Sequence, residues 1–105
     1  MTTLLVLTNV PERAVAERLA EMLVERRLVA CVNILAPCRS IYRWKGDVQH
    51  DEAHPMLMKT TAERYPALEK ALCEAHPYEL PEIIALPVER GLPAYLEWLA
   101  SQTAS

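Results

Sequence analysis

The fold of this chain is decided by one stretch of sequence, Ser40-Ile41-Tyr42-Arg43-Trp44-Lys45-Gly46-Asp47-Val48, in which a run of strand-forming residues ends at a turn. Residues 29–44 are rich in β-branched and aromatic side chains and are interrupted only around Pro37, a pattern that predicts a long strand with a kink or bulge. Lys45-Gly46-Asp47 supplies the turn, and the chain returns through residues 48–59. The sequence therefore predicts an unusually long β-hairpin.

A strand and a helix precede this hairpin. Residues 4–7 are a short apolar run typical of a buried strand, and Pro11 suits the first turn of a following helix because its missing N–H would be unpaired there. The apolar residues of that helix recur with helical spacing, at Val15, Leu19, Met22 and Leu23. The charged residues between them indicate that the opposite side of this helix faces solvent.

A second helix, a strand and a short helix follow the hairpin. The second helix begins near residues 62–66 and is stopped by Pro77, the apolar run 83–88 predicts a last strand, and a weaker helical pattern follows Pro93. The apolar face of the second helix consists of Tyr65, Leu68, Leu72 and Ala75. The order β-α-β-β-α-β with a C-terminal helix predicts an α+β fold of the ferredoxin-like, split βαβ type, in which two helices cover one face of an antiparallel sheet.

The hairpin is too long for the helices that cover the sheet. Strands of about 15 residues span about 50 Å, whereas a helix of about 15 residues spans only ~22 Å. The distal part, with Ile41, Tyr42 and Trp44, would leave apolar side chains and open edges in water unless another chain pairs with it. We therefore expect a homo-oligomer of closed symmetry built through the hairpin, with the two aromatics as intersubunit anchors rather than a stacking platform for a ligand.

Composition and charge exclude several classes of protein. The chain of 105 residues fits a single domain, and its 51% hydrophobic content argues against disorder. Its net charge of −3 lacks the basic surface of a nucleic-acid binder, and no apolar run approaches the ~18 residues of a membrane span. Three cysteines without paired spacing or a secretion signal indicate reduced thiols. We expect a cytoplasmic protein without nucleic-acid or membrane partners.

The segment His76-Pro77-Tyr78-Glu79-Leu80-Pro81-Glu82 is the candidate functional loop. Each proline drives the preceding residue into an extended conformation, so the loop is stiff and loses little entropy on binding. It carries an imidazole, a phenol and two carboxylates. Polar loops on a rigid scaffold are common sites of binding.

Six blocks of the sequence, in order, resemble the CutA family, named for divalent-cation tolerance. The blocks are residues 9–11, 28–34, 40–46, 59–61, 76–88 and 95–99, so that the resemblance extends over nearly the whole chain. It implies one CutA-like domain over residues 1–105 and a homotrimer whose long hairpins pair between chains, in the manner of PII-type signalling proteins. It also implies an association with copper and other divalent cations.

The candidate metal ligands that this resemblance implies are His76 and Cys31, with Tyr78, Glu79 and Glu82 as neighbours. Imidazole with carboxylate suits Cu(II), and thiolate suits Cu(I). Structural roles compete with this hypothesis, because His76 would also cap a helix as an imidazolium, Cys31 would also pack in a core, and the two glutamates would also form ion pairs.

Two departures from the family weaken the metal hypothesis. Some members implicated in copper binding carry a cysteine in the first strand and a histidine before the His-Pro pair, where this chain has Thr8 and Ala75. Any copper(II) site is therefore expected to be weak or shared between subunits. His50 and His54 lie about 13 Å apart on one strand and are expected at the surface, and Pro55 predicts a bulge or an unpaired edge position.

No pattern predicts an enzyme. The chain has no nucleophile-and-base motif, no glycine-rich phosphate loop and no multi-ligand metal signature. The main interpretation is a trimeric copper-binding protein of metal tolerance or homeostasis. The alternative is a PII-like sensor that binds a small metabolite in clefts between subunits, near the loops after the first and third strands and residues 76–82.

Overall fold

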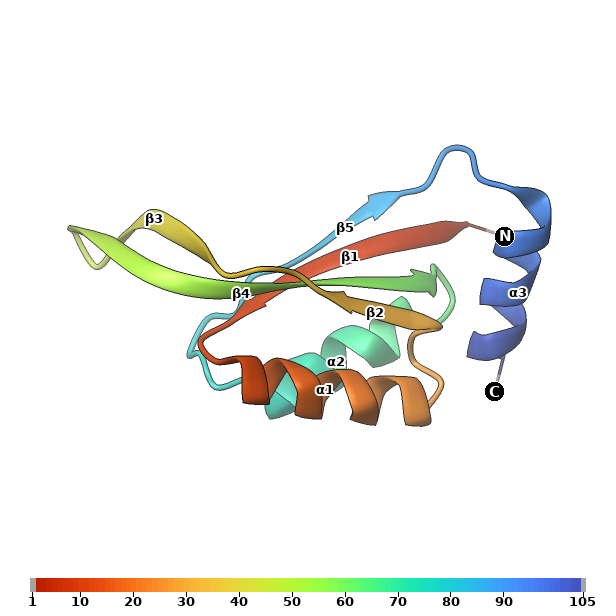
Figure 1. Cartoon of the computed structure of the whole chain (residues 1–105), viewed down its shortest axis with the longest axis horizontal. Helices are drawn as coiled ribbons and strands as arrows, with labels where there is room; N and C mark the ends of the chain where they lie inside the picture. The colour runs from red at the N-terminus through yellow and green to blue at the C-terminus, as the bar shows by residue number, and fades with distance from the viewer. Residues whose placement is uncertain (1, 105) are drawn as a thin grey trace.

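The computed structural model describes residues 2–104 and has the expected α+β architecture (Figure 1). The elements follow in the order β1 (Thr3–Val10), α1 (Arg13–Glu25), β2 (Cys31–Ile34), β3 (Cys38–Trp44), β4 (Asp47–Thr61), α2 (Tyr65–Ala75), β5 (Ile83–Pro87) and α3 (Pro93–Thr103). This confirms the split βαβ order with an added C-terminal helix. None of the described helices is long and apolar enough to cross a membrane.

One antiparallel sheet forms the centre of the molecule, with the order β2-β4-β1-β5 and with β3 paired to β4 beyond β2. β4 therefore runs the length of the molecule, bonded to β1 and β2 at one end and to β3 at the other. The register places Val6 opposite Met58 on β4 and opposite Ala85 on β5, so these three side chains share one face.

The predicted hairpin closes through a two-residue turn. Trp44 pairs with Asp47, and the residues between them, Lys45 and Gly46, both have positive φ, at 50° and 88°. Two left-handed residues are what the twist of a tight hairpin requires. Glycine adopts this conformation without strain, whereas Lys45 does so at some cost.

The interruption expected around Pro37 splits the outgoing strand into β2 and β3, while β4 continues without a break. Leu35 N donates to Pro55 O across the interruption at 2.9 Å. Because N and C=O of one strand residue point to the same side, the Pro55 nitrogen also faces this irregular segment, where no ladder donor is needed. The bulge or unpaired edge position expected for Pro55 is wrong: Pro55 is paired with Asn9 of β1 in an unbroken register, and only its nitrogen faces the interruption.

The surface position expected for His54 is wrong. β1 extends to Val10, which lies directly opposite His54, so the imidazole is on the helix-covered face and only 9% exposed. His50 is exposed, as expected. Two histidines four residues apart on one strand thus lie in different environments because β1 pairs with one of them and not with the other.

The core lies between the sheet and helices α1 and α2, which cover the same face (Figure 1). Its fully buried side chains include Val6, Val10, Leu19, Leu23, Met56, Met58, Leu68 and Leu72. α1 begins at Arg13, two residues after the proline expected in its first turn, and ends with Arg27 in a left-handed conformation. Leu28 N then bonds to Leu23 O at 3.0 Å, which closes the helix and turns the chain into the core.

The opposite face of the sheet is also apolar. Alternation along the strands places Leu5, Leu7, Leu57, Ile84 and Leu86 on it. α3 contacts β4 at one end of the sheet and leaves Ile84 and Leu86 50% and 60% exposed. We call these five residues the open face.

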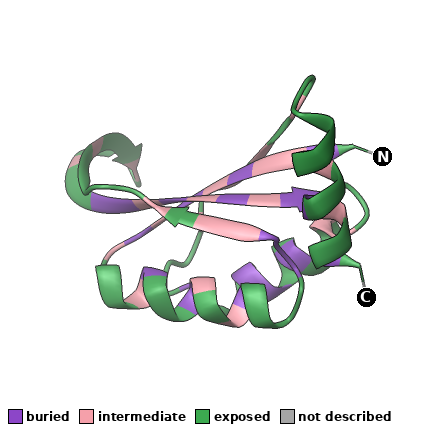
Figure 2. Cartoon of the chain, turned by 45° about the vertical axis from the view of Figure 1, so that its right-hand side comes forward, coloured by how far each residue is buried: buried purple, intermediate pink, exposed green. Residues whose placement is uncertain are grey.

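The hairpin projects beyond the layers, as its length predicts (Figure 1, left). The molecule measures 45 × 25 × 23 Å, and its radius of gyration of 14.3 Å exceeds the value of about 13 Å for a compact chain of this size. Figure 2 shows that the hairpin end is mostly exposed, whereas buried residues gather in the central strands and on the helix sides that face them. The distal hairpin therefore has little support from its own chain.

Candidate functional site

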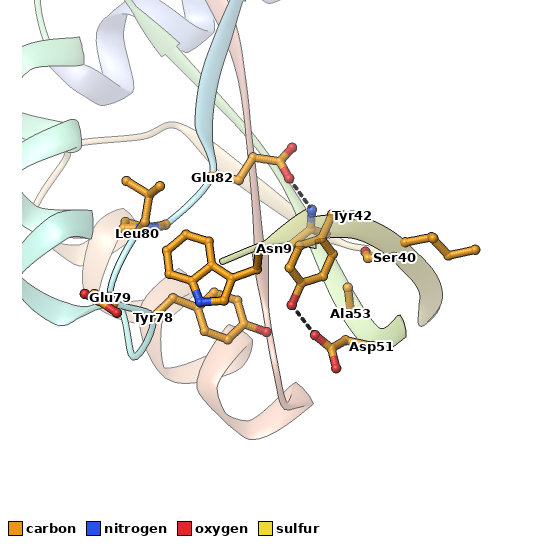
Figure 3. A pocket seen from close by; sticks show the side chains of 12 residues that line it. Asn9, Ser40, Tyr42, Asp51, Ala53, Tyr78, Glu79, Leu80 and Glu82 are labelled. Atoms are coloured by element: carbon orange, nitrogen blue, oxygen red, sulfur yellow. Dashed lines mark hydrogen bonds between the residues drawn. The ribbon is translucent and has the colours of Figure 1, made fainter. Parts of the chain in front are cut away.

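A cleft of about 630 Å³ lies between the curled hairpin and the loop 76–82 (Figure 3). Three aromatic residues line it, Tyr42 and Trp44 from β3 and Tyr78 from the loop. Three carboxylates also line it, Asp51, Glu79 and Glu82. Ile41 lines it as well, so the cleft brings the predicted loop candidates together with all three residues predicted for the trimer interface.

β1 anchors the loop to the sheet through Asn9. Its amide Nδ2 donates to Glu82 Oε1 at 3.0 Å, and its main-chain oxygen accepts a hydrogen bond from His76 Nε2 at 2.8 Å. Asn9 Oδ1 is buried and has no partner among the described residues. One residue at the end of a central strand thereby fixes both ends of the loop.

His76 is the C-cap of α2, and its ring is held as a neutral imidazole. Tyr78 N donates to Nδ1 at 3.2 Å, so Nδ1 is an acceptor and the proton resides on Nε2, which donates to Asn9 O. The residue is 8% exposed, and burial lowers the pKa of His76 below its usual value, against the opposite effect of the Asn9 bond. The structural role expected at the helix end is therefore filled by a neutral ring, not by an imidazolium.

The tyrosines of the cleft respond to the charge of Asp51. Tyr42 OH donates to the Asp51 carboxylate, a bond that raises the pKa of Tyr42, with smaller contributions from burial and from the charges of Asp51 and Tyr78. Burial, with Asp51 second, raises the pKa of Tyr78. Both phenols therefore stay protonated at neutral pH in a negative potential.

Cys31 lies away from the cleft, on β2 and beside the open face. Lys59 Nζ donates to Asn33 Oδ1 at 2.8 Å and approaches Cys31 Sγ at 3.9 Å. Cys31 pairs with Lys59 of β4, which in turn pairs with Leu5 of β1. His76 bonds to Asn9, which lies four residues from Leu5 along β1, a distance of about 13 Å. A single chain therefore does not bring the two candidate ligands together.

No three His, Cys, Asp or Glu side chains within residues 2–104 are grouped closely enough to hold a metal ion. Glu79 instead approaches Lys45 Nζ at 3.9 Å, and both side chains are exposed. Ile41, the third residue predicted for the interface, is 63% exposed. The metal and interface roles of these residues stay predictions.

Sequence reasoning missed Asn9, Asp51 and Lys45 as residues of the site. Asn9 belongs to one of the family-like blocks, but its role depends on how far β1 extends. Asp51 faces Tyr42 only because the turn sets the register, in which Ser40 opposes Asp51. The sequence identified Lys45 as part of the turn, although nothing in it placed the Lys45 side chain near residue 79.

Comparison with known proteins gives the family. Residues 4–102 match the family described as CutA1 divalent ion tolerance protein. The chain is 47% identical over 98 residues to the divalent-cation tolerance protein CutA of Thermus thermophilus, covering 93% of this chain and 95% of that protein. It is 45% identical over 95 residues to mouse protein CutA, covering 90% of this chain and 54% of the mouse protein, so it spans about half the length of that relative.

Solved structures agree in fold and sequence. The Cut A1 structure from Thermus thermophilus superposes with a TM-score of 0.95 at 45% identity, covering 97% of this chain and 99% of that one. CutA1 from a psychrotrophic Shewanella species gives a TM-score of 0.94 at 39% identity, covering 98% of this chain and 96% of that one. The resemblance seen in the sequence is thereby confirmed, and the chain belongs to the CutA1 family of divalent ion tolerance proteins.

Proposed function

We propose that the protein is a cytoplasmic homotrimer that binds a divalent cation, with copper(II) as the first metal to test, in a tolerance or homeostasis role. The observation that carries the proposal is the family match over residues 4–102, because the family and its relatives are named for divalent-cation tolerance. The number of subunits, the metal and the compartment go beyond that match.

The open face supports the oligomer. Full burial of a Leu or Ile side chain contributes roughly 1.5–3 kcal/mol. Ile84 and Leu86 are at least half exposed in one chain, so an assembly that buries them gains much of this free energy. Within residues 2–104, no strand pairs beyond β5 at one edge of the sheet or beyond β2 and β3 at the other. Because these are two different edges, pairing one with the other between chains is a heterologous contact, which ends in a ring or continues as a fibre. A closed ring satisfies both edges, and three is the number of subunits that the family resemblance implies.

The donor set supports a weak site shared between subunits. The neutral ring of His76 is the protonation state that a metal ligand needs, and Nδ1 becomes available if the bond from Tyr78 N opens. Cys31 lies beside the open face, where a neighbouring chain would approach. Ligands from different chains fit the separation of these two groups within one chain.

A copper titration of tag-free protein against a competing chelator tests the metal proposal. We expect micromolar binding that is lost in His76→Ala and weakened in Cys31→Ser. The matched control is His50→Ala, which removes an exposed histidine from the hairpin and leaves α2 and its loop intact. Weak, non-saturating binding that is equal in His76→Ala and His50→Ala would contradict His76 as a ligand.

A further inference from the structure

The cleft has aromatic walls that the metal proposal does not use. For Tyr42 and Trp44 we replace the intersubunit role predicted from the sequence with a ligand-binding one. Tyr42 and Tyr78 both line the cleft, and Figure 3 shows both rings beside it. Trp44 lines the same space. The faces of aromatic rings carry negative electrostatic potential, and three of them around one cavity favour a cation that is large and weakly hydrated.

The charges of the cleft all have one sign. Asp51, Glu79 and Glu82 are among its lining residues, which include no Lys, Arg or His. Two of these carboxylates are held in place, Asp51 by the Tyr42 hydroxyl and Glu82 by the Asn9 amide. Phosphates and other anions are therefore repelled, and a cation is attracted before it makes any contact.

An ammonium group already occupies the rim of the cleft. Lys45 Nζ lies 5.6 Å from the centroid of the Trp44 ring and 3.9 Å from Glu79 Oε2. This is the pairing of an aromatic face and a carboxylate that recognises ammonium compounds. Because Lys45 and Glu79 are exposed, their ion pair contributes little and a ligand can displace it.

We propose that this cleft binds a small organic cation that carries an alkyl-substituted ammonium group. The volume of about 630 Å³ suits an organic molecule and is far larger than a metal ion needs. Leu80 and Ala53 add apolar surface for the alkyl groups, while the three carboxylates balance the charge. Asn9 also lines the cleft and holds Glu82 in place through its amide nitrogen.

The site is independent of the metal proposal and is tested on the assembled protein with EDTA present. Trp98→Phe leaves Trp44 as the only tryptophan, so its fluorescence reports the cleft. The probe is choline at constant ionic strength, and the matched neutral probe is 3,3-dimethylbutan-1-ol, which has the same shape without the charge. We expect saturable quenching with choline in the millimolar range, and no saturation with the alcohol.

Variants separate the cleft from general electrostatics. Asp51→Asn keeps an acceptor for Tyr42 and is expected to weaken choline binding about tenfold. Glu52→Gln removes the same charge from the next residue, whose side chain points to the other face of β4, and is expected to leave the affinity unchanged. Lys45→Asn removes the competing ammonium, keeps a residue that tolerates positive φ, and is expected to tighten binding several-fold.

Three results would overturn the inference. The first is no saturable response to choline, and the second is an equal response to the neutral alcohol. The third is an equal loss in Asp51→Asn and Glu52→Gln, which would show that only the net charge of the hairpin matters. Light scattering on each variant, Trp98→Phe included, identifies any change of assembly, and the two titrations of Trp98→Phe alone decide whether either of the first two results occurs.

Discussion

The two faces of the sheet have the same chemistry and opposite environments. On the covered face, Val6 and Met58 are fully buried under α1 and α2. On the open face, Ile84 and Leu86 are at least half exposed. An antiparallel sheet with one solvated face alternates apolar and polar residues, whereas β1 and β5 contain continuous apolar runs. One chain therefore supplies a cover for only half of a sheet whose sequence suits burial on both sides.

The largest effect is expected from a cavity on the covered face. Met58→Ala removes a fully buried side chain between β4, α1 and α2 and is expected to lower the free energy of unfolding by about 2–5 kcal/mol. Chemical denaturation at a fixed protein concentration measures it. A loss below about 1 kcal/mol would show that this face is not the rigid core of the chain.

A charge on the open face is expected to act on assembly rather than on the fold. Leu86→Lys replaces an apolar side chain that we expect between subunits, and the lost burial corresponds to roughly 1.5–3 kcal/mol for each subunit. We expect dissociation on dilution in light scattering with an unchanged far-ultraviolet circular dichroism spectrum. Glu89→Lys, just beyond β5, is the control. Assembly that survives Leu86→Lys as well as it survives the control would remove the open face from the interface.

The pH dependence of stability reports the buried imidazole of His76 at the end of α2. Because the pKa of His76 is lowered in the folded state, the unfolded chain binds the proton more readily. The stability linked to this ring is complete above the unfolded pKa of about 6.5 and is lost as the pH falls from there toward the folded pKa, by at most about 1.4 kcal/mol per pH unit.

His76→Gln is expected to flatten this dependence below about pH 6.5, because glutamine does not titrate and still reaches Asn9 O. Denaturation curves at several pH values measure the slope. An equal slope in parent and variant would assign the acid sensitivity to another group. His50→Gln, on the exposed hairpin, is expected to leave the slope unchanged.

The smallest effect is expected at the end of α1, away from both faces. Arg27 has φ of 58°, and Arg27→Gly removes the strain of a side chain in the left-handed region. The gain is expected to be about 0.5–1 kcal/mol in the free energy of unfolding, with no change in the mass of the assembly. A loss of stability would mean that the Arg27 contact with Gln102 O outweighs the strain.

The order of elements could be predicted because the spacing of apolar residues that identifies a helix or a strand is local in the sequence. Alternating and helical spacing identified the hairpin, both covering helices and the last strand, and the turn at Lys45-Gly46 fixed where the hairpin folds back. His54 was misplaced because its burial depends on the end of a different strand. A side chain's face follows from pairing across the sheet, which spacing within one strand does not contain.

The cleft could be predicted only in part. Residues 76–82 were identified from their prolines and polar groups, but their neighbours come from the curl of the hairpin. A one-residue change of register at the turn would place Tyr42 and Asp51 on opposite faces of the hairpin. The sequence specifies that register, although the twist that brings the hairpin over the loop is a property of the folded sheet.

The mass of the native protein in solution shows whether copies of this chain complete the sheet. Light scattering coupled to size separation, at micromolar concentration and without added metal, is expected to give three times the chain mass of 11.9 kDa, the proposed closed trimer in which other copies cover the open face and both sheet edges. A mass of one chain, with Ile84 and Leu86 remaining in water, would contradict the claim that this sheet is completed by its own copies.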